Sequence, residues 1–190
     1  MLLVNLIFSL ISGFVSIFLT AHIFILLDES FVALGLFSLV NFIFVLIFQM
    51  VGGAICKRKN PLLVIRLSAI LSFFLLSLVL ILDEQLIYYY IVLALLWGSI
   101  VGFYFSAQQF LVAKKTSGEK MLRFVATYTT VASALQLFFP ITFGLVIHYG
   151  SFFMIGLVIL ILAVLLILAT LLIKNEAKIE KTRKLDFKNY

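Results

Sequence analysis

The sequence predicts an all-α membrane protein with six transmembrane helices. Hydrophobic residues make up 65% of the chain and charged residues 12%, whereas soluble domains contain roughly 45–50% and about 25%. The apolar residues fall in long unbroken runs, and a helix needs roughly 20 such residues to cross a bilayer. Strands of a membrane barrel would instead alternate between apolar and polar residues. A soluble fold of 190 residues could not bury this much apolar surface.

Six apolar runs are long enough to cross a bilayer, and we expect them to form one transmembrane domain over residues 1–173. Their expected bounds are about Leu3–Leu27, Phe31–Ile55, Leu62–Leu82, Leu86–Ala113, Arg123–Ile147 and Phe152–Ile173. The first run is too long for the apolar part of a signal peptide and has no basic segment before it, so it is expected to remain as a helix. Residues 174–190 form a basic tail after the last span.

The turn between the second and third spans, residues 52–63, is short and basic. The three consecutive cations from Lys57 to Lys59 cannot lie in hydrocarbon, so this turn lies in water. Asn60 suits the N-cap of a following helix, and Pro61 suits its first position. The sequence therefore predicts that the third helix begins here.

The cations gather on one side of the membrane. All fourteen flank the second loop, flank the fourth loop or lie in the tail. They are Lys57, Arg58, Lys59, Arg66, Lys114, Lys115, Lys120, Arg123, Lys174, Lys178, Lys181, Arg183, Lys184 and Lys188. The charged residues of the first and third loops are only acidic: Asp28, Glu29, Asp83 and Glu84. Because two spans separate each basic segment from the next, the positive-inside rule places both termini in the cytoplasm. We therefore expect a multi-pass protein of a bacterial cell membrane.

Polar residues line one face of the first span. Asn5, Ser9, Ser12, Ser16 and Thr20 follow one another at steps of four, three, four and four residues, which keeps them on one side of a helix. Two interpretations remain open for this face. Small and hydroxyl side chains pack against neighbouring helices in membranes, and they also line polar cavities.

The fourth span carries a small-residue face and two larger polar residues. Gly98, Gly102 and Ser106 recur at intervals of four, which predicts close contact with another helix. Tyr104 and Gln108 lie further along the chain, and a long amide within a span is costly unless it has a partner. Tyr104 and Gln108 are therefore candidates for a polar cavity.

The fifth span is the most polar, and Pro140 with Gly144 is expected to bend it or let a neighbour approach. Asn41 of the second span lies near mid-membrane. Its side chain could form an interhelical hydrogen bond or contact a ligand, and both interpretations remain open. The full set of candidates for a substrate cavity is Asn5, Ser12, Ser16, Asn41, Tyr104, Gln108, Tyr128 and Gln136.

Several functional classes are not expected from this sequence. No Asp, Glu, Lys or Arg lies deep in a predicted span, which argues against proton coupling through a carboxylate. The sequence has no metal-ligand set and no nucleophile or phosphate-binding motif, so we expect neither an enzyme nor a metal or cofactor site. The net charge of +6 reflects orientation in the membrane rather than binding to nucleic acid.

The basic turn resembles a loop of the major facilitator superfamily of transporters. That family's loop between helices two and three runs roughly Gly-x-Leu-x-Asp-Arg-x-Gly-Arg-Lys. The chain matches it at Gly53, approximately at Ile55, and at Arg58. It departs from the family at Lys57, where an Asp is usual, and at Asn60, where a glycine is usual.

Two later segments also resemble this family, and the resemblance covers nearly the whole chain. Residues 97–104 look like its fourth helix. Arg123, Pro140 and Gly144 look like its fifth helix, where Gly-Pro-x-x-Gly is common and where Phe139 here replaces the first glycine.

The resemblance implies the amino-terminal half of a secondary transporter, a bundle of two inverted three-helix repeats that moves a small solute across the cytoplasmic membrane. The family has twelve spans in two halves, with the substrate between them. The chain would then be a half-length or truncated member. Such a member would work as a homodimer or with a partner membrane chain.

Two alternatives belong to other functional classes. The membrane subunits that capture vitamins for energy-coupling-factor importers have about this length and six helices, and small-residue faces would serve their docking. A non-transporting immunity or regulatory protein of the membrane is also compatible with the absence of deep charges.

Overall fold

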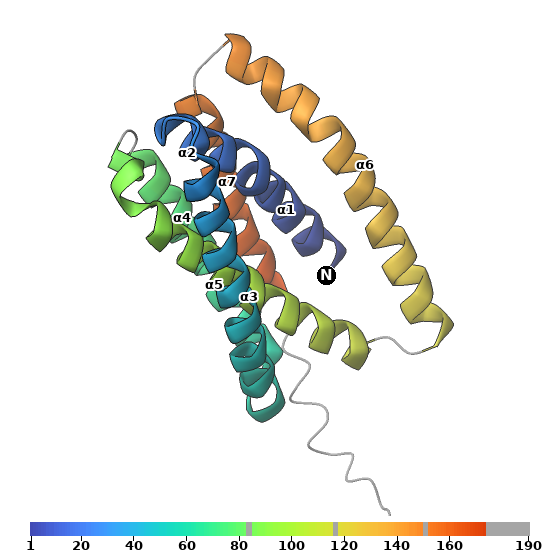
Figure 1. The fold of residues 1–190 in the computed structure, drawn as a ribbon. Helices are drawn as coiled ribbons and strands as arrows, with labels where there is room; N and C mark the ends of the chain where they lie inside the picture. Colours follow the sequence, from blue (N-terminus) through green and yellow to red (C-terminus); the bar gives the residue numbers. More distant parts are fainter. Residues whose placement is uncertain (83–84, 116–117, 150–151, 174–190) are drawn as a thin grey trace, which may run out of the picture.

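The computed structural model describes residues 1–82, 85–115, 118–149 and 152–173, and these form a bundle of helices (Figure 1). Six helices are long and apolar enough to cross a membrane, and the described residues contain no strand. The predicted all-helical architecture, with six helices long enough to cross a membrane, is therefore confirmed for the described residues. The acidic loop at Asp83 and Glu84 and the tail from Lys174 lie outside the described residues.

The predicted spans correspond one to one with the helical spans of the structure. The elements are α1 (Leu2–Gly13), η1 (Phe14–Leu19), α2 (Thr20–Leu26), α3 (Phe31–Arg58), α4 (Pro61–Leu82), α5 (Leu86–Lys115), α6 (Glu119–Tyr149) and α7 (Phe152–Leu172). The first three are continuous and together form the first span, Leu2–Leu26. α3, α5 and α6 extend a few residues beyond the predicted ends, most of all α6, whereas the first span and α7 each end one residue earlier than predicted.

The turn between α3 and α4 is shorter than the sequence predicts. α3 ends only at Arg58, three residues beyond the predicted end of the span at Ile55, so residues 56–58 are helical rather than part of the turn. Cations in the last turn favour this extension because they lie at the negative end of the helix dipole. The predicted start of the next helix is confirmed, since the Leu62 amide donates to Asn60 Oδ1 at 3.0 Å and α4 begins at Pro61.

A π-helical segment, η1, interrupts the first span. Its wider turns change which residues share a face. The Thr20 hydroxyl donates to the Val15 carbonyl at 3.0 Å, five residues earlier. The polar face predicted for this span is not uniformly buried: Ser9 is buried, Ser12 at the end of α1 is partly exposed, and Ser16 within η1 is exposed.

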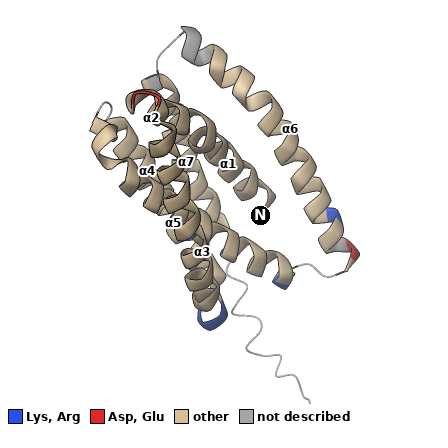
Figure 2. Ribbon diagram, viewed as in Figure 1, with Lys and Arg blue, Asp and Glu red and all other residues tan. Residues whose placement is uncertain are grey.

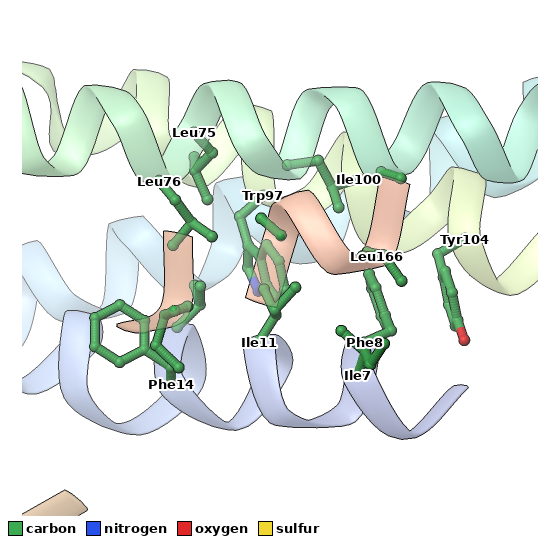
Figure 3. Close-up of a cluster of buried hydrophobic side chains, with 14 of the residues drawn as sticks. Ile7, Phe8, Ile11, Phe14, Leu75, Leu76, Trp97, Ile100, Tyr104 and Leu166 are labelled. Atoms are coloured by element: carbon green, nitrogen blue, oxygen red, sulfur yellow. The ribbon is translucent and has the colours of Figure 1, made fainter. Parts of the chain in front are cut away.

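Helices α1, α4, α5 and α7 form the centre of the bundle. α4 packs against α5 and α7, and α1 packs against α7. The buried side chains labelled in Figure 3 are Ile7, Phe8, Ile11, Phe14, Leu75, Leu76, Trp97, Ile100, Tyr104 and Leu166. Among them, the Phe8 ring stacks on Tyr104 with 3.5 Å between ring centroids and on Trp97 with 6.1 Å. This stack joins the first span to α5.

α3 lies directly against α5 along the predicted small-residue face. A Cβ atom on Gly98 would touch the backbone of α3, and one on Gly102 would lie 2.7 Å from the Val45 carbonyl oxygen. Glycine at both positions therefore lets the two backbones approach, as the spacing predicts. The opposite side of α3 is exposed, and its side chains are apolar, including Phe42, Leu46 and Met50.

α6 stands apart from the other helices at the edge of the bundle (Figure 1). It contacts α1 and, to a smaller extent, α7. The Phe139 ring covers Gly13. The centroid of the Phe18 ring lies 6.0 Å from the ring centroids of both Phe139 and Phe143. Side chains rather than close backbones thus hold α6 to the bundle.

The described Lys and Arg residues lie toward one end of the bundle, which also carries Glu119 at the start of α6 (Figure 2). Cations gather at the α3–α4 turn, at the end of α5 and in the first turns of α6, all at one end, which we call the basic end. Asp28 and Glu29 lie between α2 and α3 at the opposite end. Arg66, one turn inside α4, donates from Nε to the Thr170 carbonyl of α7 at 3.4 Å.

Candidate functional site

A buried hydrogen bond between α1 and α5 connects two of the predicted cavity residues. Tyr104 donates its hydroxyl to Asn5 Oδ1 at 2.6 Å, and both side chains are fully buried. The two residues are 99 positions apart in the chain. The stacked Phe8 ring lies against Tyr104 and fixes the direction in which its hydroxyl points.

A second hydroxyl contact lies one turn further along α1. Ser9 Oγ and the Tyr128 hydroxyl of α6 are 3.4 Å apart. Gln108, one turn beyond Tyr104 on the same side of α5, is also buried. We call Asn5, Ser9, Tyr104, Gln108 and Tyr128 the polar cluster. The polar face of α1 therefore meets both α5 and α6.

The Asn5 amide is only half satisfied. Its Oδ1 accepts from Tyr104, whereas its Nδ2 is buried and has no hydrogen-bond partner. A buried donor without an acceptor costs about 1–3 kcal/mol. Buried polar groups nearly always have partners, so such a donor marks a position where an acceptor from outside the chain would be stabilising.

Four predicted cavity residues lie outside the polar cluster. Asn41 lies on α3 beside Gly98, and its Oδ1 is buried without a partner. Gly98 and Tyr104 are six residues apart, which is about 240° around a helix, so α5 separates Asn41 from the cluster. Ser12 is partly exposed, and Ser16 and Gln136 are exposed. The eight candidates therefore do not surround one common space.

The residues that resemble the transporter loop lie within a helix. Gly53 and Arg58 both belong to α3. A Cβ atom on Gly53 would meet nothing within 4 Å, whereas one on the preceding Gly52 would touch Ser106 of α5. Arg58 lines an open depression at the basic end together with Val51, Ala54, Ile55 and Lys59.

Two residues of this region were not among the cavity candidates. Ser9 belongs to the predicted polar face, and its spacing of four from Asn5 was the available indication of its place beside the site. The packing role of Gly52 had no such indication. Gly52 and Gly53 are adjacent, and the sequence does not show which of the two faces another helix.

No family model, curated protein or solved structure matches the chain.

The polar cluster offers hydrogen bonds without charge. Its groups are two phenol hydroxyls, one aliphatic hydroxyl and two carboxamides, next to the flat faces of Phe8 and Trp97. Such a set suits a neutral molecule with hydrogen-bond acceptors and an apolar face. The five residues of the cluster include no Asp, Glu, His, Lys or Arg.

Proposed function

We propose that this chain is a six-helix unit of a secondary transporter of the major facilitator type and that it moves a small neutral solute across the cell membrane. The observation that carries the proposal is the buried, unpartnered Nδ2 of Asn5 within the polar cluster. A donor kept in that state within an apolar span is costly unless a solute uses it.

The pattern of helix contacts supports an inverted repeat. If the first span is exchanged with α5, α3 with α6, and α4 with α7, most of the helix contacts map onto one another. The contact between α2 and α3 is the exception, since α5 and α6 make no comparable contact among the described residues. The α3–α5 pair corresponds to α6–α1, the α4–α5 pair to α7–α1, and the α4–α7 pair to itself. Inverted repeats with a binding site between them are common in secondary transporters.

The two corresponding pairs differ in how closely they pack, and this difference supports a site near α6. Glycines bring α3 against α5, whereas Tyr128 and Phe139 hold α6 at a side chain's distance from α1. A small movement of α6 would open the polar cluster without disturbing the centre of the bundle.

The role of a vitamin-capture subunit has less support. Its docking surface was expected on the small-residue faces, and α3 already covers Gly98 and Gly102. Those glycines are therefore not open to a docking partner.

Solute flux tests the proposal. The purified protein would be placed in liposomes, and entry of a radiolabelled hexose, nucleoside and polyol would be measured against protein-free liposomes. We expect flux of at least one of these neutral solutes. Tyr104→Phe should lower the flux roughly three- to tenfold, the factor for one neutral hydrogen bond, and Asn5→Leu should abolish it.

Ser16→Ala is the control, because Ser16 lies on the same span but is exposed. Its flux should equal that of the unchanged protein. The absence of flux for every neutral solute, or equal flux in Asn5→Leu, would refute the proposal. Tight binding without flux would favour a capture subunit.

A further inference from the structure

α6 carries exposed polar side chains along the edge of the face that packs on the first span. Thr129, Ser133 and Gln136 are exposed, and their spacing of four and three places them on one side of the helix, which we call the α6 stripe. The Thr129 hydroxyl is satisfied within the helix, since it donates to the Val125 carbonyl at 2.6 Å. The side chain of Gln136 has no hydrogen-bond partner among the described residues.

Pro140 adds a second unmet group at the same place. It lies within α6, four residues after Gln136, and it has no N–H to donate to the Gln136 carbonyl. Gln136 is near the middle of the span Met121–Leu145, where hydrocarbon offers no hydrogen bonds. Its carbonyl and its side-chain amide therefore need partners from outside the chain.

The exposed surface of α3 shows what a lipid-facing helix of this protein looks like. α3 is as peripheral as α6, but Phe42, Leu46 and Met50 cover its outward side. These side chains are apolar, so contact with hydrocarbon leaves no polar group without a hydrogen bond. The α6 stripe differs in composition, which indicates that something other than lipid covers it.

We propose that the α6 stripe packs against the α6 stripe of a second copy of this chain, about a two-fold axis along the membrane normal. Two copies of one chain insert with the same orientation, so a helix on such an axis meets its own copy in parallel and each residue lies opposite itself. Only a self-complementary side chain suits that position.

Gln136 has this property. A carboxamide contains both donors and an acceptor, so two of them can hydrogen-bond to each other across the axis. Ser133 is small, and a Cβ atom on Gly144 would meet nothing within 4 Å, so the neighbouring positions leave room for a second helix. This inference rests on the proposed function in one respect, namely that a six-helix transporter unit requires a second unit.

Cysteine cross-linking in native membranes tests the contact. Cys56→Ala provides a cysteine-free background, since Cys56 is the single cysteine of the chain. Ser133→Cys and Gln136→Cys would report the stripe. Ala134→Cys and Phe138→Cys are matched controls, because both positions are exposed on a different side of α6. Mild oxidation should give a covalent dimer at the stripe positions and at least tenfold less at the controls.

A second measurement tests the amide itself. In the Ser133→Cys reporter, Gln136→Leu should lower the cross-linked fraction at limiting protein-to-lipid ratio by roughly three- to thirtyfold, the range for an interhelical hydrogen bond in a membrane. Gln136→Asn should restore much of the cross-linking, which a purely structural role of Gln136 would not explain.

Equal cross-linking on both sides of α6, none at the stripe, or covalent attachment to a protein of different size would overturn the proposal. Cross-linking at the stripe in a protein without solute flux would confirm this interface and refute the proposed transport. Solute flux from a protein that forms no such dimer would support the proposed transport and refute this interface.

Discussion

Gly102 determines how closely α3 lies against α5. A Cβ atom at this position would lie 2.7 Å from the Val45 carbonyl oxygen and 2.8 Å from the Gln49 amide nitrogen. Both neighbours are backbone atoms, so a larger residue at Gly102 has to separate two helices rather than displace one flexible side chain.

The substitution Gly102→Ala is therefore expected to lower the free energy of unfolding by about 1–3 kcal/mol, the usual cost of overpacking. The measurement is the midpoint of thermal unfolding in detergent. Gly53→Ala is the matched control on a peripheral helix, since its added Cβ meets nothing within 4 Å. It should leave stability unchanged or raise it by up to about 1 kcal/mol. Equal losses in both variants would contradict this account of the α3–α5 contact.

At the scale of residues, the sequence predicts types better than pairings. The spacing of Gly98 and Gly102 predicts a helix contact, and the structure confirms it. Asn5 and Tyr104 were both cavity candidates, but the bond between them depends on two helices meeting across 99 positions. No local pattern contains that information.

At the scale of elements, η1 shows where helix periodicity stops being a guide. A regular helix would keep Ser16 on the same face as Asn5 and Ser9. In the structure Asn5 and Ser9 are buried, whereas Ser16 lies within η1 and is exposed. Short apolar sequences such as Phe14–Leu19 carry no composition that distinguishes a π-helix from an α-helix. The polar face was therefore predicted one turn too long.

The Thr20 hydroxyl helps to hold this π segment by donating to Val15 at 3.0 Å. Thr20→Val keeps the shape of the side chain and removes the donor. We expect amide hydrogen exchange over residues 14–19 to become roughly two- to tenfold faster, the factor for one modest hydrogen bond. Ser16→Ala, in the same segment but exposed, should not change the exchange rate. Unchanged exchange in Thr20→Val would show that packing alone holds the segment.

At the scale of the whole molecule, the six spans and the gathering of Lys and Arg at one end were predictable. Both depend on the order of residue types along the chain. The order of neighbours was not predictable. That α3 packs on α5, while α6 remains at the edge, depends on contacts between spans that lie far apart in sequence. The same limit separated the eight cavity candidates into one cluster and several isolated residues.

The two ends of the bundle allow a test of orientation. Lys59 lies at the basic end of the bundle and Asp28 at the opposite end, and both are exposed. In the Cys56→Ala background, Asp28→Cys should react with a membrane-impermeant thiol reagent in intact cells. Lys59→Cys should react only after the cells are permeabilised, because the positive-inside rule places it in the cytoplasm. The reverse pattern would invert the proposed topology.

Helix α7 has a consequence for how the protein is made. It leaves the ribosome after the other five spans described here, yet Ile155, Ile159 and Ala163 are fully buried, and it packs against α4 and α1. Until α7 enters the membrane, the faces of α1 and α4 that it covers lack their neighbour. α6 precedes it and stays at the edge, which leaves the central position open. We therefore expect these six helices to reach their native packing only after synthesis of α7, with the nascent chain up to α6 relying on the insertion machinery.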